Sequence, residues 1–285
     1  MNIPYIYEAL NWASSFLGES GREPQAAVWL LAHKVNTDQT SLHLDRGERL
    51  TEEVWNAFQK DVKTHASGVP VQHITGEGAF YGRIFSVNKH VLIPRPETEE
   101  LAHEVIQWLG RQKSGSVRSG VDIGTGSGAL AVTIALESES IEMTATDLMA
   151  GALQKAEQNA DKLGAAIEFI QGDLARPLQG RMFDVVVSNP PYIPVDQWEK
   201  LDDIVKVHEP RTALVGEDED GLSCYRKLAE DIPAILNRPG LAAFEIGMDQ
   251  GRQALAIFKQ AFPDDEVWLK QDINKRDRMI FVEKR

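Results

Sequence analysis

The chain has 285 residues, of which 42% are hydrophobic and 26% are charged, a balance typical of a folded globular protein rather than a disordered one. The net charge of −13 is unevenly placed, with −2 on residues 1–120 and −11 on residues 121–285, which argues against a phosphate-backbone partner, although a local basic patch can hide in a negative total. Without a bilayer-long apolar run or a signal-peptide pattern, and with Cys224 as its single cysteine, the sequence predicts a cytoplasmic protein that binds neither membrane nor nucleic acid directly.

Residues 1–71 are predicted to form a small helical domain. Within it, apolar residues recur at three- and four-residue spacing in three segments, residues 6–17, 23–35 and 51–66. Thr51 is expected to cap the third helix. In residues 72–95 the apolar residues alternate instead and glycine recurs, which predicts a β-hairpin linker.

Residues 96–285 alternate between strand-like and helix-like segments. Pro96 suits the first position of a helix, and five strands are then predicted at residues 120–124, 141–147, 167–173, 183–188 and 240–247. Helical patterns separate these strands, and residues 266–272 and 278–284 are expected to form a final hairpin. Such alternation predicts an α/β fold, a doubly wound, mostly parallel sheet whose ligands bind beyond the carboxyl ends of the strands.

A glycine-rich turn closes the first of these strands. In "DIGTGSG", Gly124, Gly126 and Gly128 let the backbone turn tightly, with Thr125 and Ser127 between them. The spacing is G-x-G-x-G and not the G-x-G-x-x-G of dinucleotide folds, which disfavours NAD, and no P-loop motif is present. Alone, such a turn is also explained as purely structural.

Two carboxylates at the ends of the next strands strengthen the prediction of a cofactor site. Asp147 is placed to accept both ribose hydroxyls of an adenosine, and it would repel the 2′-phosphate of NADP. Asp173, with Leu174 beside it, is placed to reach the adenine edge. Each aspartate alone is more simply a helix cap or a loop residue, but three successive strand ends of this kind favour an adenosine site.

The "SNPPY" motif at residues 188–192 narrows the class of protein. "DIGTGSG" resembles the cofactor loop of class I S-adenosylmethionine-dependent methyltransferases, and "SNPPY" resembles the motif of those that modify a planar nitrogen. The stretches "GVPVQHITGEGAFYGRIFSVNKHVLIPRPETEEL" and "HEPRTALVGEDEDGLSCYRKL" resemble the bacterial release-factor glutamine methyltransferases, the PrmC or HemK family. The helical domain before the hairpin matches their layout, so the resemblance covers essentially the whole chain.

The resemblance implies a seven-stranded Rossmann-like methyltransferase sheet, S-adenosyl-L-methionine as cofactor, and peptide chain release factors as protein substrates of a monomeric enzyme. Residues 124–128, Asp147, Asp173, Leu174 and Asn189 would bind the cofactor. The reaction would methylate the N5 side-chain amide of the glutamine in the Gly-Gly-Gln motif.

Asn189, Pro190 and Tyr192 are the predicted catalytic residues, and together with Pro191 they are predicted to bind the substrate. An amide nitrogen is a poor nucleophile, so we expect Asn189 Oδ1 and the Pro190 carbonyl to accept its two N–H groups. The two prolines stiffen this corner, and Tyr192 offers a flat face to the planar group. The simpler interpretation is a proline-rich strand exit with Tyr192 in the core.

Other candidate residues are weaker. The resemblance implies that Arg95, Glu97 and Thr98 help to close the site over the cofactor, although Glu97 and Thr98 equally suit a plain helix start. Phe80 and Phe85 could line the substrate entrance, but core packing is the favoured interpretation of both.

The remaining motifs suggest structural rather than catalytic roles. Residues 208–211 could order the loop that follows the active site, and the acidic run at residues 217–220 is most simply a solvated loop. No histidine or cysteine spacing suggests a metal, and Cys224 is interpreted as a packed or surface thiol. The alternatives that remain are a nucleic-acid adenine-N6 methyltransferase and a cofactor-binding protein without turnover.

Overall fold

The computed structural model describes residues 3–112 and 117–285, which fall into two compact units. Met1–Glu77 and Asp203–His208 form one, called the helical unit below, and Gly78–Asp202 and Glu209–Arg285 form the other, called the sheet unit. The division between Glu77 and Gly78 falls inside the hairpin linker predicted at residues 72–95. The assignment of Asp203–His208 to the helical unit was not predicted from the sequence.

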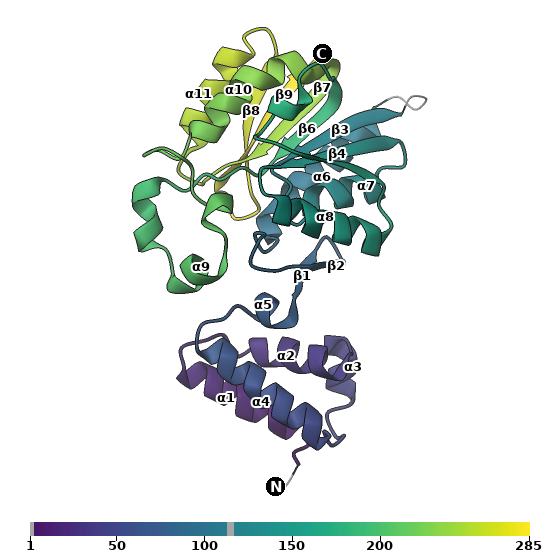
Figure 1. The fold of residues 1–285 in the computed structure, drawn as a ribbon, viewed down its shortest axis with the longest axis vertical. Helices are drawn as coiled ribbons and strands as arrows, with labels where there is room; N and C mark the ends of the chain where they lie inside the picture. The colour runs from purple at the N-terminus through teal and green to yellow at the C-terminus, as the bar shows by residue number, and fades with distance from the viewer. Residues whose placement is uncertain (1–2, 113–116) are drawn as a thin grey trace. The chain divides into compact units, whose positions relative to one another are not determined.

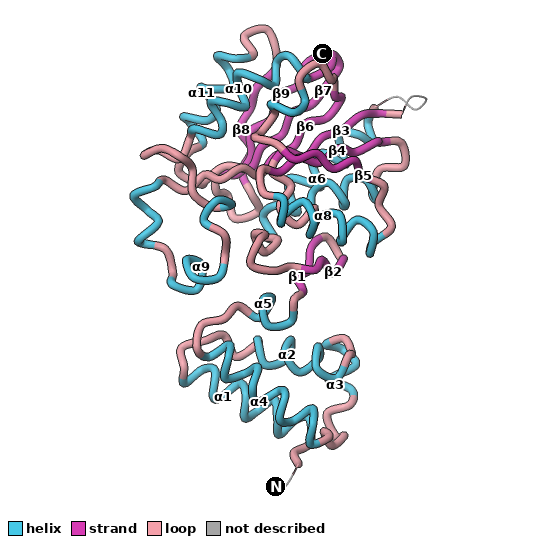
Figure 2. The backbone as a smooth tube through the Cα atoms, in the orientation of Figure 1, coloured by secondary structure: helices cyan, strands magenta, loops and turns pink. Residues whose placement is uncertain are grey.

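The helical unit is built around a small apolar core in which α1, α2 and α4 pack together (Figure 2). The predicted helices correspond to these three, and Thr51 caps α4 as expected, because its Oγ1 accepts a 3.2 Å hydrogen bond from the Val54 N–H. The helices of the unit are α1 Ile6–Glu19, α2 Ala26–Val35, α3 Gln39–Leu44, α4 Glu52–Ala66, α5 Val71–Thr75 and α9 Asp203–His208.

The predicted hairpin is shorter than expected, because α5 occupies the start of the segment. Val71 is buried in the core of the helical unit, and Gly76 ends α5 with a φ of 74°, in the left-handed region that favours glycine. The two strands that follow, β1 Glu77–Phe80 and β2 Arg83–Ser86, form a two-stranded sheet. Phe80 and Phe85 are fully buried with their ring centroids 6.0 Å apart, which confirms core packing for Phe85, whereas Phe80 packs in the core and also lines the cavity described below.

The sheet unit contains the predicted parallel sheet. Within the described residues, seven strands pair in the order β5-β4-β3-β6-β7-β9-β8, and only β9 runs in the direction opposite to the other six. The chain runs outward from β3 to β5 and then returns to β6 beside β3, which creates the switch point where ligands of such sheets bind. The strands are β3 Arg118–Ile123, β4 Ile141–Asp147, β5 Ile167–Gln171, β6 Phe183–Ser188, β7 Leu236–Glu245, β8 Glu266–Gln271 and β9 Asp277–Lys284.

Helices cover both faces of the sheet (Figure 1). One core holds α6, α7 and α8 against one face, and a second core holds α10 and α11 against the other. Alternate residues of the central strand β6 enter the two cores, Val186 on the α10 side and Val185 and Val187 on the α6 side, as expected for a doubly wound fold. These helices are α6 Pro96–Arg111, α7 Ala129–Glu137, α8 Ala150–Leu163, α10 Ser223–Ile235 and α11 Gly251–Ala261.

In the part of the chain that the structure describes, no helix has both the length and the apolar character needed to cross a bilayer.

Candidate active site

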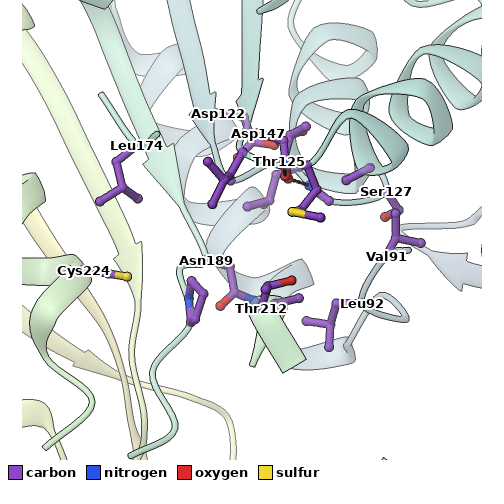
Figure 3. Close-up of a pocket in the computed structure, with 18 of the residues that line it drawn as sticks. Val91, Leu92, Asp122, Thr125, Ser127, Asp147, Leu174, Asn189, Thr212 and Cys224 are labelled. Carbon is purple, nitrogen blue, oxygen red and sulfur yellow. Dashed lines mark hydrogen bonds between the residues drawn. The ribbon is translucent and has the colours of Figure 1, made fainter. Parts of the chain in front are cut away.

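A cavity of about 720 Å³ opens at the carboxyl edge of the sheet, within the sheet unit. Its walls come from the ends of four neighbouring strands, with Asp122 from β3, Asp147 from β4, Asp173 after β5 and Asn189 after β6. Figure 3 shows the side chains of Asp122, Thr125 and Asp147 gathered on one side, with Asn189 across from them. The strand ends that the sequence singled out therefore meet at one cavity.

The glycine-rich turn forms one wall of this cavity. The main-chain N–H groups of Gly124 and Thr125 both donate to the carbonyl of Thr146, 2.9 Å away, which fixes the turn against β4. Gly124, Thr125, Gly126 and Ser127 line the cavity. Their backbone thus lies where a ligand would contact it.

Gly128, which was also expected to bind the cofactor, is not among the cavity-lining residues. It precedes α7 with a φ of 81°, and a Cβ at this position would lie 3.2 Å from Ala156 Cα in α8. Glycine is therefore required here by the close approach of α8 and by the left-handed backbone.

Asp122 is a site residue that the sequence reasoning missed as a functional candidate. Its Oδ2 accepts hydrogen bonds from Thr125 Oγ1 (2.6 Å) and from the Ala131 N–H (3.2 Å). Its Oδ1 is buried and has no hydrogen-bond partner among the described residues. Burial raises the pKa of Asp122 to about 7, against the lowering by those two hydrogen bonds. The signal available in the sequence was an aspartate two residues before the first glycine of the turn.

Asp147, Asp173 and Leu174 all line the cavity. The Asp147 carboxylate accepts hydrogen bonds from the N–H groups of Gly126 and Met149, both at 2.9 Å, and burial raises its pKa. Asp173 forms a 3.0 Å ion pair with Arg176. Each carboxylate retains lone pairs for a ligand, and the adenosine contacts expected of them stay predictions.

Asn189 stands at the end of β6 and faces the cavity. Ser188 Oγ donates to the Ile123 carbonyl at 2.6 Å, which ties the end of β6 to β3. Asn189 Nδ2 donates to Thr98 Oγ1 at 3.1 Å, and Thr98 Oγ1 donates to Glu245 Oε2 at 2.6 Å. Because the NH₂ group is directed at Thr98, the Asn189 oxygen points away from Thr98 and is available to a substrate.

The other residues of the motif lie in different surroundings. Pro191 lines the cavity, whereas Pro190 is buried and neither it nor Tyr192 is among the lining residues. The Tyr192 ring is partly buried against the core on the α10 side, and this burial raises the pKa of its hydroxyl to about 12. The Tyr192 carbonyl accepts a 2.9 Å hydrogen bond from Gln250 Nε2. The predicted catalytic and substrate-binding roles of these three residues remain predictions.

Glu245, at the end of β7, does not line the cavity but contacts the Thr98 and Asn189 side chains behind its wall, and it was not predicted from the sequence. The residue is 1% exposed, and burial raises its pKa to about 7, opposed first by the hydrogen bond from Thr98 and then by the charge of Arg278. The signal was a glutamate inside the otherwise apolar strand "GLAAFEIG".

Residues between 90 and 98 and between 211 and 217 complete the walls of the cavity. Arg95 pairs with Glu209 at 2.5 Å, and the Ile93 N–H donates to the other oxygen of this carboxylate at 3.3 Å. The residue at 209 therefore orders its loop, as expected for residues 208–211.

The acidic run at residues 217–220 is held by α10. Glu217 pairs with Lys227 at 2.6 Å, and Asp218 and Asp220 pair with Arg226. The run is mostly exposed, but it is anchored by these ion pairs and is not merely solvated. Cys224 is buried as expected, lines the cavity and has its thiol pKa raised by burial.

Comparison with known proteins shows which family the chain resembles. A model described as the PrmC N-terminal domain matches residues 8–76, and one described as the methyltransferase small domain matches residues 105–206. A curated release factor glutamine methyltransferase from Bacillus anthracis is 44% identical over 280 residues, which cover 98% of this chain and 99% of that protein. The corresponding protein of Geobacter sulfurreducens is 33% identical over 277 residues, covering 96% of this chain and 95% of that protein.

Solved structures share the fold. A methyltransferase from Pyrococcus furiosus superposes with a TM-score of 0.52 at 16% identity, over 79% of this chain and 97% of that one. The Thermus thermophilus 16S rRNA N2 G1207 methyltransferase, solved with AdoMet and guanosine, gives a TM-score of 0.51 at 15% identity, over 73% of this chain and 50% of that one. These likenesses show the fold alone. The near full-length identity to curated relatives shows more, and this chain belongs to the release factor glutamine methyltransferase family.

Proposed function

We propose that the protein transfers a methyl group from S-adenosyl-L-methionine to the N5 side-chain amide of the glutamine in the Gly-Gly-Gln motif of class I peptide chain release factors. The observation that carries the proposal is Asn189, whose amide oxygen accepts no hydrogen bond from the described residues and lies at a cavity in a chain 44% identical to a named release factor glutamine methyltransferase.

The residues of the cavity fit the proposed cofactor. A volume of about 720 Å³ lies within the range of small-molecule sites. The partnerless Asp122 Oδ1 is a buried acceptor suited to an ammonium group, and the Asp147 carboxylate is suited to a pair of hydroxyls. We therefore assign the amino-acid end of the cofactor to Asp122 and the ribose to Asp147, with Asp173 and Leu174 beside the adenine.

The chemistry asked of the protein is placement of a weak nucleophile. The bound cofactor supplies an electrophilic methyl group on a sulfonium sulfur. Asn189 Oδ1 accepts one N–H of the glutamine amide and the Pro190 carbonyl accepts the other, which orients the nitrogen and favours its pyramidal form. The N–CH₃ bond forms as the S–CH₃ bond breaks, the sulfur becomes neutral, and the nitrogen then releases its proton to water.

The partner is proposed to be a protein. The helical unit matches the PrmC N-terminal domain and is assigned the role of docking the release factor. The net charge of −11 on residues 121–285 disfavours the alternative substrate, an adenine amine in a nucleic acid. We infer a monomeric cytoplasmic enzyme.

Labelled methyl transfer tests the substrate. Purified release factor, its Gly-Gly-Gln→Gly-Gly-Ala variant and bulk nucleic acid are each incubated with the enzyme and methyl-labelled cofactor. Label is expected on the unmodified release factor alone. Label on the Gly-Gly-Ala variant or on nucleic acid would refute the proposed substrate.

Asn189→Ala tests the role of the motif. The variant should lower kcat by roughly 10²–10³, the cost of removing one preorganised hydrogen-bonding group from a transition state. Cofactor affinity should stay within about twofold, so the cofactor contact that the resemblance also implies for Asn189 would contribute little to binding. Calorimetric titration with the cofactor separates the two effects. Loss of cofactor binding by a folded variant would show that Asn189 acts elsewhere.

A further inference from the structure

A hydrogen-bond chain behind Asn189 connects it to a buried carboxylate. The chain runs from Asn189 Nδ2 to Thr98 Oγ1 (3.1 Å) and from Thr98 Oγ1 to Glu245 Oε2 (2.6 Å). Its members come from the loop after β6, the first turn of α6 and the end of β7, and Thr98 and Glu245 are both buried. The proposed reaction uses Asn189 and gives no role to the other two.

The chain fixes the direction of every donor in it. Thr98 has one hydroxyl proton, and an ionised carboxylate is its strongest available acceptor, so the proton points to Glu245. Thr98 Oγ1 then has only lone pairs to offer Asn189, and the amide must present its NH₂ group to them. The Asn189 oxygen consequently faces away from Thr98.

The Glu245 carboxyl is buried and lies near charges of both signs. Arg278 of β9 lowers its pKa by charge, whereas Glu97 of α6 raises it. The Asn189 side chain also lowers it by hydrogen bonding. Two further titratable groups face this region, the Tyr192 ring and, from α10, Tyr225, whose hydroxyl donates to the Glu245 main-chain carbonyl at 2.8 Å.

We propose that Glu245 is a positioning residue which, through Thr98 and through its own hydrogen bond from the Asn189 side chain, holds the Asn189 amide with Oδ1 toward the substrate. The inference rests on the proposed methyl transfer, because it explains how the acceptor of that reaction is oriented. Glu245 itself contacts no reacting atom.

Protonation of Glu245 should reverse the direction of the hydrogen bonds in this chain. A neutral carboxyl can donate to Thr98 Oγ1, which frees the Thr98 proton to turn toward Asn189 and favours the flipped amide. Since the pKa of Glu245 is raised to about 7, the rate of methyl transfer should fall as the pH drops below that value.

Two substitutions separate the role of Glu245 as a hydrogen-bond acceptor from the effect of its protonation. In Glu245→Leu the buried Thr98 hydroxyl loses its acceptor, so the Asn189 oxygen becomes its next one and kcat should fall about tenfold or more. In Glu245→Gln an acceptor is kept without a titrating proton, so part of the rate should return and the acid limb near pH 7 should disappear. Cofactor affinity should stay within about twofold in both.

A control and a double variant give readouts that a merely structural role would not produce. Glu283→Gln alters another β-strand carboxylate that accepts from α6, through Trp108 Nε1 at 2.8 Å, and it should leave kcat unchanged. In the Asn189→Ala background, Glu245→Leu should cost nothing further, because its effect passes through Asn189.

The labelling assay with release factor distinguishes the possible failures. Wild-type transfer with an equal kcat in Glu245→Leu, or an additive loss in the double variant, would overturn the inference and leave the proposed function standing. An acid limb of kcat that persists in Glu245→Gln at saturating cofactor, where titration of Asp122 in the cofactor site no longer limits binding, would also overturn it. If wild-type enzyme transfers no label to release factor, the proposed function fails and this inference fails with it.

Discussion

Asn159 in α8 offers the sharpest test of how the cofactor loop is held. Its Nδ2 donates to the carbonyls of Ser86 (2.9 Å) and Ser127 (2.8 Å), and its Oδ1 accepts from the Ser86 N–H at 2.7 Å. One fully buried side chain therefore joins the hairpin strand β2 to the glycine-rich turn. Asn159→Ala removes all three hydrogen bonds at once.

The expected cost follows from the number of hydrogen bonds lost. A net contribution of about 1 kcal/mol for each gives about 3 kcal/mol, or a fall in Tm of roughly 6–12 °C for a unit of this size. Urea unfolding followed by circular dichroism measures the loss. Asn159→Asp should cost at least as much, since its carboxylate would face the carbonyls of Ser86 and Ser127.

The matched control is Gln158→Ala, one position earlier in α8, where the side chain is exposed and accepts a hydrogen bond from Lys155. It should change the unfolding free energy by less than about 0.5 kcal/mol. A loss below about 1 kcal/mol in Asn159→Ala, or an equal loss in Gln158→Ala, would refute the idea that Asn159 anchors the loop.

Three further predictions concern cofactor affinity, backbone strain and pH. Asp147→Ala should weaken cofactor binding by about 1.5–3 kcal/mol in calorimetric titration, and unchanged affinity would remove Asp147 from the ribose site. Gly128→Ala should destabilise the protein in thermal unfolding, because the new Cβ would lie 3.2 Å from Ala156 Cα; an unaltered Tm would contradict this close packing. Because Glu245 holds its proton to about pH 7 when folded and releases it near 4.5 when unfolded, the unfolding free energy of the cofactor-free protein should fall as pH rises through this window. Glu245→Gln should remove about 3 kcal/mol of that fall, and parallel curves for the two proteins would count against the raised pKa.

Much of the sheet unit could be predicted because short apolar runs between helical patterns, and glycine-rich turns, are local signals. β4 and β6 begin and end where the apolar pattern placed them, at residues 141–147 and 183–188. Parallel pairing then requires the ends of these strands to meet at one edge, which is why Asp147 and Asn189 could be expected near each other, whereas the role of Asn189 came from the resemblance of the "SNPPY" motif.

Features that depend on contacts distant in sequence were not predictable in this way. Gly128 carries the same local signature as Gly124 and Gly126, but its requirement comes from Ala156, on another helix. The six residues of α9 belong with the helical unit, where the His208 ring lies 6.1 Å from that of His73 by centroids, although about 130 residues separate the two. The apolar periodicity of α9 or of the helical unit does not indicate that the two segments pack together.

The chain behind Asn189 shows how a local signal and a distant contact combine. The apolar strand "GLAAFEIG" predicts that Glu245 is buried, and a buried carboxylate needs a donor, yet the strand does not say which one. The donor depends on where α6 begins. Pro96 has no N–H and is suited to the first helical position, which sets the phase of the helix and places Thr98 in its third position. A start one residue later would turn the side chain by about 100° around the helix axis, away from Glu245. The proline that fixes a helix start therefore also determines which end of a distant asparagine faces the substrate.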